Sequence, residues 1–95
     1  MKKLEKNLRK NGYDYELIKR TDKVALYAQT IHGDVIGYEV FFIKEQKESN
    51  VVIDNVKVHF EHKEAFPSNE DFGNIAWSFT MEKNAISRYE ALIKV

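Results

Sequence analysis

The sequence predicts an α+β domain: a three- to five-stranded antiparallel sheet, arranged as a meander, with an N-terminal and a C-terminal helix packed on one face. Three observations support this prediction. Segments in which apolar and polar residues alternate fill much of the chain, short turns separate the first of them, and amphipathic segments lie at both ends. Because strands joined by short turns pair antiparallel, these strands should form a meander.

The first helix is expected over residues 2–11. Leu4 and Leu8 are four residues apart and would share one helical face, while Lys and Arg dominate the other positions. Asn11 and Gly12 then provide a helix stop. A basic helix is therefore expected before the sheet.

Three strands are expected to follow. The first begins at Tyr13, where apolar residues alternate with acids, the second runs over 24–31 and the third over 35–44. Turns at 21–23 and 32–34 separate them. The third strand is apolar on both faces, which is typical of the centre of a sheet.

A polar break follows these strands. Residues 44–50 are almost entirely polar, and we expect a mobile loop there. Residues 51–60 are weakly strand-like, because Val56, Val58 and Phe60 alternate with polar residues, although two polar residues before Val56 interrupt the pattern.

Residues 66–77 carry the clearest local signals. The structural motif in this stretch consists of Pro67, Ser68, Asp71, Phe72, Gly73 and Trp77. Ser68 precedes Asp71 by three residues, as in a capping box, and Gly73 offers a left-handed stop. A helical turn over 69–72 should therefore lead into a strand in which Trp77 and Phe79 share a face. The alternative is one longer helix through Trp77, which the pair Gly73 and Asn74 disfavours.

The C-terminal helix is expected over about residues 81–94. Its apolar stripe consists of Ala85, Ile86, Tyr89, Leu92 and Ile93. We expect this stripe to meet Phe72, Trp77 and Phe79.

Composition limits the class of protein. The 95 residues are 43% hydrophobic and 32% charged, which fits a single globular domain over residues 1–95. No apolar run approaches the roughly 18 residues of a membrane span, and no apolar segment follows the N-terminal lysines as in a signal peptide. We therefore expect a cytoplasmic protein without a membrane partner.

No catalytic, metal or cofactor site is predicted. The chain has no cysteine, which excludes thiolate metal ligands and a cysteine nucleophile. His59 and His62 would point to opposite faces of a strand, so their side chains would not converge on a metal. No serine lies in a nucleophile elbow, and the glycines are scattered rather than clustered as in a phosphate-binding loop.

Basic residues gather near the N-terminus. Residues 1–23 carry eight Lys and Arg against four Asp and Glu, a net charge of +4. The nucleic-acid-binding alternative would use Lys2, Lys3, Lys6, Arg9 and Lys10. An α-β-β-β-α order with a basic first helix also has the outline of a double-stranded-RNA-binding domain. The net charge of zero over the whole chain argues against phosphate-dominated binding.

One stretch carries a resemblance. The string FPSNEDFG from Phe66, the pair Ala76 and Trp77, and the later Ala85, Tyr89 and Leu92 resemble small uncharacterised proteins of phage and prophage type. The resemblance covers about the last 60 residues. It implies an α+β accessory protein of the bacterial cytoplasm and transfers no catalytic residues. The leading expectation is therefore a non-enzymatic binding module, of phage accessory type, that docks on another protein.

Overall fold

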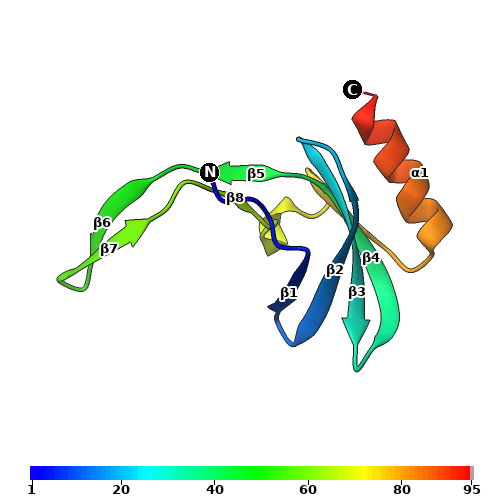
Figure 1. Ribbon diagram of the computed structural model, residues 1–95, viewed down its shortest axis with the longest axis horizontal. Coiled ribbons are helices and arrows are strands. Elements are labelled where there is room, and N and C mark those ends of the chain that lie inside the picture. Colours follow the sequence, from blue (N-terminus) through cyan, green and yellow to red (C-terminus); the bar gives the residue numbers. More distant parts are fainter. Residues whose placement is uncertain (95) are drawn as a thin grey trace.

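Five antiparallel strands form the main sheet, in the order β1-β2-β3-β4-β9 (Figure 1). The structure is a computed structural model that describes residues 1–94. The sheet consists of β1 (Asn7–Lys10), β2 (Tyr13–Arg20), β3 (Val24–Ile31), β4 (Asp34–Phe42) and β9 (Ala76–Phe79). Outside it lie β5 (Lys44–Gln46), β6 (Ser49–Ile53), β7 (Val56–Phe60), β8 (Lys63–Ala65), the 3-10 helix η1 (Asn69–Asp71) and the helix α1 (Glu82–Ile93). The α+β class and the antiparallel sheet are confirmed.

The predicted N-terminal helix is wrong. Residues 7–10 form the edge strand β1, which pairs with β2 in a register that places Leu8 opposite Tyr15. Asn11 and Gly12 have φ values of 55° and 84°, as in a two-residue type I′ hairpin turn. These residues therefore join two strands instead of ending a helix.

The helix α1 covers one face of the sheet over β3, β4 and β9 (Figure 1). Its buried residues Ala85, Tyr89 and Leu92 pack with Val24, Leu26 and Val40 of the sheet. Trp77 and Phe79 border this cluster, and the Arg88 guanidinium lies 4.9 Å from the centre of the Trp77 ring. The C-terminal helix and its contact with Trp77 are confirmed.

An aromatic cluster occupies the face of the sheet opposite α1. Tyr27 and Phe41 are fully buried on adjacent strands, and their rings stack with centroids 5.7 Å apart. The segment before η1 places Phe66 edge-on against both rings, at 5.3 and 4.8 Å. Leu4, Leu8 and Phe72 also border this cluster. Phe72 therefore lies on the other side of the sheet from α1, and its predicted contact with the last helix is wrong.

The motif around η1 adopts the predicted local structure. The Asp71 carboxylate accepts hydrogen bonds from the Ser68 N–H at 2.8 Å and from the Ser68 hydroxyl at 3.1 Å, which is a capping-box arrangement. Pro67 is buried, and Gly73 has a φ of 86°. After this turn the chain enters β9, in which Trp77 pairs with Val40 of β4.

Candidate functional site

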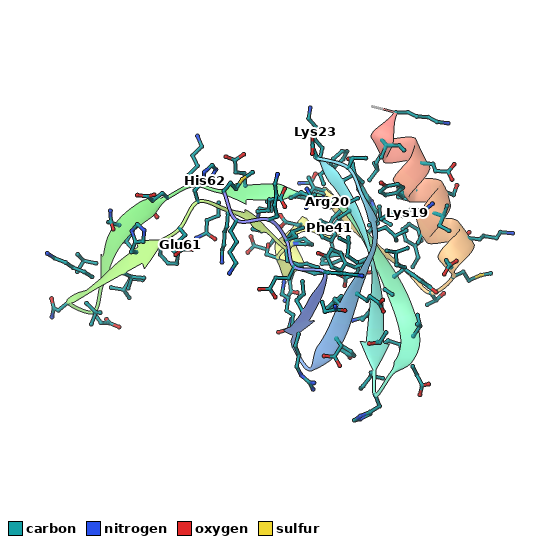
Figure 2. All side chains as sticks on the ribbon, in the orientation of Figure 1. Lys19, Arg20, Lys23, Phe41, Glu61 and His62 are labelled. Atoms are coloured by element: carbon teal, nitrogen blue, oxygen red, sulfur yellow. The ribbon has the colours of Figure 1, made fainter. Side chains whose placement is uncertain are left out.

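Residues 44–65 form a long hairpin, which we call the arm (Figure 1). Its base is the pair β5–β8, and its distal part is the pair β6–β7. The arm projects from the body of the protein on the side away from α1 (Figure 2). The polar loop expected over 44–50 is wrong, because β5 spans Lys44–Gln46 and β6 begins at Ser49.

A tight turn sets the register of the distal ribbon. Asp54 and Asn55 have φ values of 50° and 64°, as a two-residue type I′ turn requires. This turn pairs Ile53 with Val56 and Ser49 with Phe60. Directly opposed residues in a β-pair lie on the same face, so the turn determines which side chains gather together.

The two faces of the ribbon differ sharply in polarity. We define the apolar face as Val51, Ile53, Val56, Val58 and Phe60. We define the polar face as Asn50, Val52, Lys57 and His59. A 2.8 Å hydrogen bond between the side chains of Asn50 and His59 ties the two strands together on the polar face.

Solvent reaches the apolar face. Ile53 is 52% exposed, Val56 60%, Val51 39% and Phe60 36%, and none of the five residues belongs to either hydrophobic core cluster of residues 1–94. A two-stranded hairpin is at best marginally stable in water, and contiguous exposed apolar side chains mark interaction surfaces. The distal ribbon therefore has the properties expected of a surface that binds a partner.

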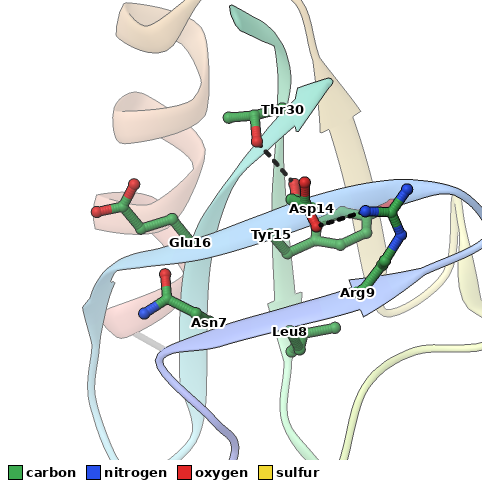
Figure 3. Close-up of a pocket in the computed structure, with 7 residues that line it drawn as sticks. All are labelled: Asn7, Leu8, Arg9, Asp14, Tyr15, Glu16 and Thr30. Atoms are coloured by element: carbon green, nitrogen blue, oxygen red, sulfur yellow. Dashed lines mark hydrogen bonds and ion pairs between the residues drawn. The ribbon is translucent and has the colours of Figure 1, made fainter. Parts of the chain in front are cut away.

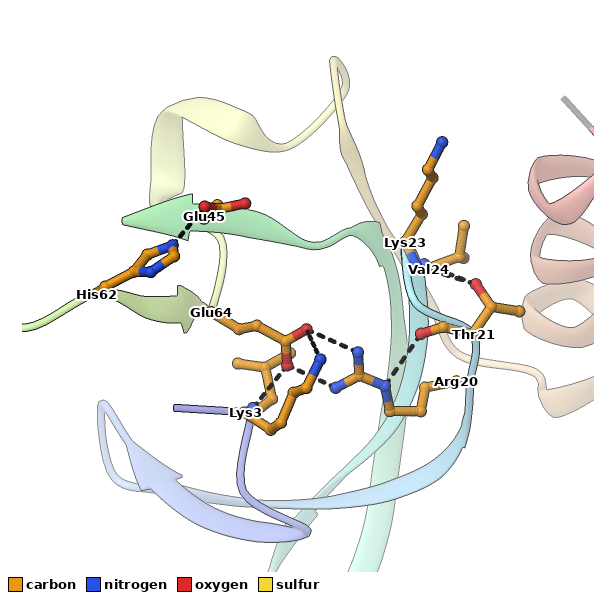
Figure 4. Close-up of polar contacts among 9 residues, drawn as sticks. Lys3, Arg20, Thr21, Lys23, Val24, Glu45, His62 and Glu64 are labelled. Carbon is orange, nitrogen blue, oxygen red and sulfur yellow. Dashed lines mark hydrogen bonds and ion pairs between the residues drawn. The ribbon is translucent and has the colours of Figure 1, made fainter. Parts of the chain in front are cut away.

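Glu64 anchors the base of the arm to the body (Figure 4). Its side chain is buried, and its carboxylate accepts a two-pronged hydrogen bond from Arg20 of β2, at 2.6 and 2.8 Å. The Leu4 N–H also donates to this carboxylate at 2.8 Å, and the Lys3 ammonium lies 3.8 Å away. The hydrogen bonds from Arg20, aided by the one from Leu4, outweigh burial and lower the pKa of Glu64 to about 2.

The N-terminal segment pairs with the base through an isolated parallel bridge between Lys2 and Lys63. The Lys2 N–H donates to the His62 carbonyl at 3.1 Å, and the Glu64 N–H donates to the Lys2 carbonyl at 2.8 Å. On the other strand, the Glu45 carboxylate contacts the His62 imidazole (Figure 4). The base is thus held on several sides, whereas the distal ribbon stands alone.

The basic residues of the nucleic-acid alternative do not share one helical face. Lys3 faces Glu64, Arg9 lies 3.5 Å from Asp14, and the Lys10 ammonium donates to the Pro67 carbonyl at 2.6 Å. Lys2 lies in the bridge to Lys63, and Lys6 precedes β1. The structure spreads the five residues along an extended segment, and three of them have partners within the protein.

An open hollow of about 380 Å³ lies on the α1 side of β1, β2 and β3 (Figure 3). The Arg9–Asp14 ion pair borders it, and the Thr30 hydroxyl donates to the Asp14 carbonyl at 3.3 Å. Arg9 and Asp14 neutralise each other, and Glu16 is the other charged residue that lines the hollow. One exposed carboxylate in an open hollow is not enough to recognise a ligand.

Within residues 1–94, no group of three or more His, Cys, Asp and Glu side chains is placed to hold a metal ion. No helix in the same part of the chain has both the length and the apolar character needed to cross a membrane.

Comparison with known proteins adds no relative. The chain matches no protein-family model, no curated protein and no solved structure. Function is therefore inferred from the geometry of the arm.

Proposed function

We propose that the protein is a non-enzymatic binding module that docks on a protein partner through the apolar face of its arm. The observation that supports this proposal is the separation of the ribbon into two faces. Five apolar side chains gather on one face, and four of them are between 36% and 60% exposed. Such a surface suits a protein partner, because apolar side chains gain free energy when a complementary surface removes them from water.

The anchoring of the arm also supports this proposal. Arg20, Glu64 and the Leu4 backbone fix the base of the arm to the sheet, so the ribbon extends from a defined place on the body of the protein. A preorganised binding element loses less conformational freedom on docking than a mobile loop does. The resemblance of about the last 60 residues to small phage and prophage proteins suggests an accessory role for such a module.

The nucleic-acid alternative has weaker support. It depended on a basic helix, and the residues in question lie on an extended segment and on β1 instead. The ion pairs of Lys3 and Arg9 also reduce the positive charge available to phosphates.

Affinity capture with matched variants tests the proposed function. Wild type, Val56→Asp and Val52→Asp are each immobilised and exposed to a bacterial lysate supplemented with the untagged protein. Val52 is the control because it is 67% exposed but lies on the polar face. Burying an unpaired carboxylate is unfavourable by several kcal/mol, so Val56→Asp should reduce retention of the partner roughly tenfold or more.

Mass spectrometry of the retained proteins gives the result. We expect at least one protein to be retained by wild type and by Val52→Asp and to be lost with Val56→Asp. Identical retention by all three baits, or no retained protein at all, would contradict the proposal. Circular dichroism of the two variants checks that both remain folded.

A further inference from the structure

We propose that the partner of the arm is a second copy of the chain, and that two arms pack with their apolar faces together in a symmetric dimer. This inference rests on the proposed function, because it takes the apolar face as the docking surface. It goes further by naming the occupant and the symmetry. The charge, shape and area of the distal ribbon support the dimer.

The charge of the surface permits self-association. The apolar face carries no ionisable side chain, and Lys57 and His59 of the same strand lie on the polar face. Two copies can therefore meet without placing like charges opposite each other. The whole chain has a formal net charge of zero, so no long-range repulsion opposes the encounter.

The shape of the face suits an antiparallel pair of ribbons. Near the base, the large Phe60 is opposite the small Ser49, and near the tip Ile53 is opposite Val56. A two-fold axis through the middle pair, Val51 and Val58, places the tip of each ribbon over the base of the other. The β-branched side chains of the two inner faces would then interdigitate, as in packed sheets separated by about 10 Å.

The area predicts a weak dimer. From exposed fractions of 36% to 60%, we estimate roughly 300 Å² of exposed apolar surface on each face. Two faces together fall below the roughly 1,200 Å² at which stable specific interfaces begin. We therefore expect reversible association in the micromolar range or weaker, and an increase in the dimer with protein concentration.

Single-cysteine variants test this dimer directly, because the natural chain contains no cysteine. Val58→Cys places a thiol beside the proposed axis, and Val52→Cys places one on the polar face of the same ribbon. Treated with a bis-maleimide reagent that spans about 10 Å, Val58→Cys should form a cross-linked dimer roughly tenfold faster or more than Val52→Cys, because association raises the effective thiol concentration. Sedimentation velocity over a concentration series should show a dimer for wild type that Val56→Asp abolishes.

The possible outcomes separate this inference from the proposed function. A monomer at every concentration, together with equal cross-linking of the two cysteine variants, would overturn the dimer. If Val52→Cys cross-links faster, the copies meet through the polar face, which also overturns it. Loss of the dimer alone, with arm-dependent capture of another protein intact, would leave the proposed function standing.

Discussion

Phe41→Ala should lower the free energy of unfolding by about 3–5 kcal/mol, the usual result of truncating a fully buried phenylalanine. Phe41 has no exposed surface, stacks on Tyr27 and receives the edge of Phe66. Its removal would leave a cavity between the sheet and the segment before η1. Because domains of this size have a total stability of about 5–15 kcal/mol, urea unfolding should shift strongly or show a largely unfolded protein.

Phe60→Ala is the matched control for this prediction. Phe60 is 36% exposed on the arm and lies outside both core clusters. Its truncation should change the urea midpoint only slightly, since exposed substitutions usually alter stability by about 0.5 kcal/mol or less. Equal destabilisation by the two variants would show that the arm belongs to the core of the fold.

Arg20→Met should destabilise the protein by about 3–5 kcal/mol at neutral pH, because it leaves the buried Glu64 carboxylate without its main partner. The Glu64 side chain is only 3% exposed, and the remaining Lys3 ammonium is 3.8 Å away on a largely exposed side chain. Thermal or urea unfolding of the variant measures the effect. The double variant Arg20→Met with Glu64→Leu should recover much of the loss, since it removes both charges.

The same pair predicts a pH dependence. In the wild type, the pKa of Glu64 is lowered to about 2, whereas a glutamate in an unfolded chain titrates near 4.3. The stabilisation from Glu64 is therefore complete above the unfolded value and is lost as the pH falls towards about 2. The stability difference between wild type and Arg20→Met should shrink over this window. A difference that stays constant from neutral pH to about pH 2 would show that charge on Glu64 is not the cause.

The elements predicted correctly are those with strong local signals. The alternation from Tyr13 to Lys44 and the short turns correspond to β2, β3 and β4, and the stripe of the last helix corresponds to α1. Ser68 and Asp71 form the predicted capping box, since such a motif involves only neighbouring residues.

The N-terminal helix failed because its two signals are ambiguous. Leu4 and Leu8 are four residues apart, and this spacing fits one face of a helix as well as one face of a strand. Asn11 and Gly12 can stop a helix, but the same pair is the strongest signal for a two-residue hairpin. The pairing of β1 with β2 decides between these structures, and it is a tertiary interaction.

The arm was missed for a related reason. Lys44–Gln46 has poor strand composition, and it becomes a strand by pairing with Lys63–Ala65, nearly twenty residues later. The alternation of Val56, Val58 and Phe60 was visible in the sequence. Its partner face on β6 was not, because that pairing depends on reading Asp54 and Asn55 as a turn. A two-residue turn flanked by alternating apolar residues is the signal that would have revealed the apolar face.

Photo-cross-linking from the two faces of β6 tests the central claim most directly. A benzophenone amino acid replaces either Val51, 39% exposed on the apolar face, or Val52, 67% exposed on the polar face. Each variant is irradiated as purified protein and in bacterial lysate. Docking through the apolar face predicts protein adducts from position 51 and few from position 52, although Val52 is the more exposed. If cross-linking instead followed solvent exposure, position 52 would give as many adducts as position 51 or more. That result would contradict docking through the apolar face.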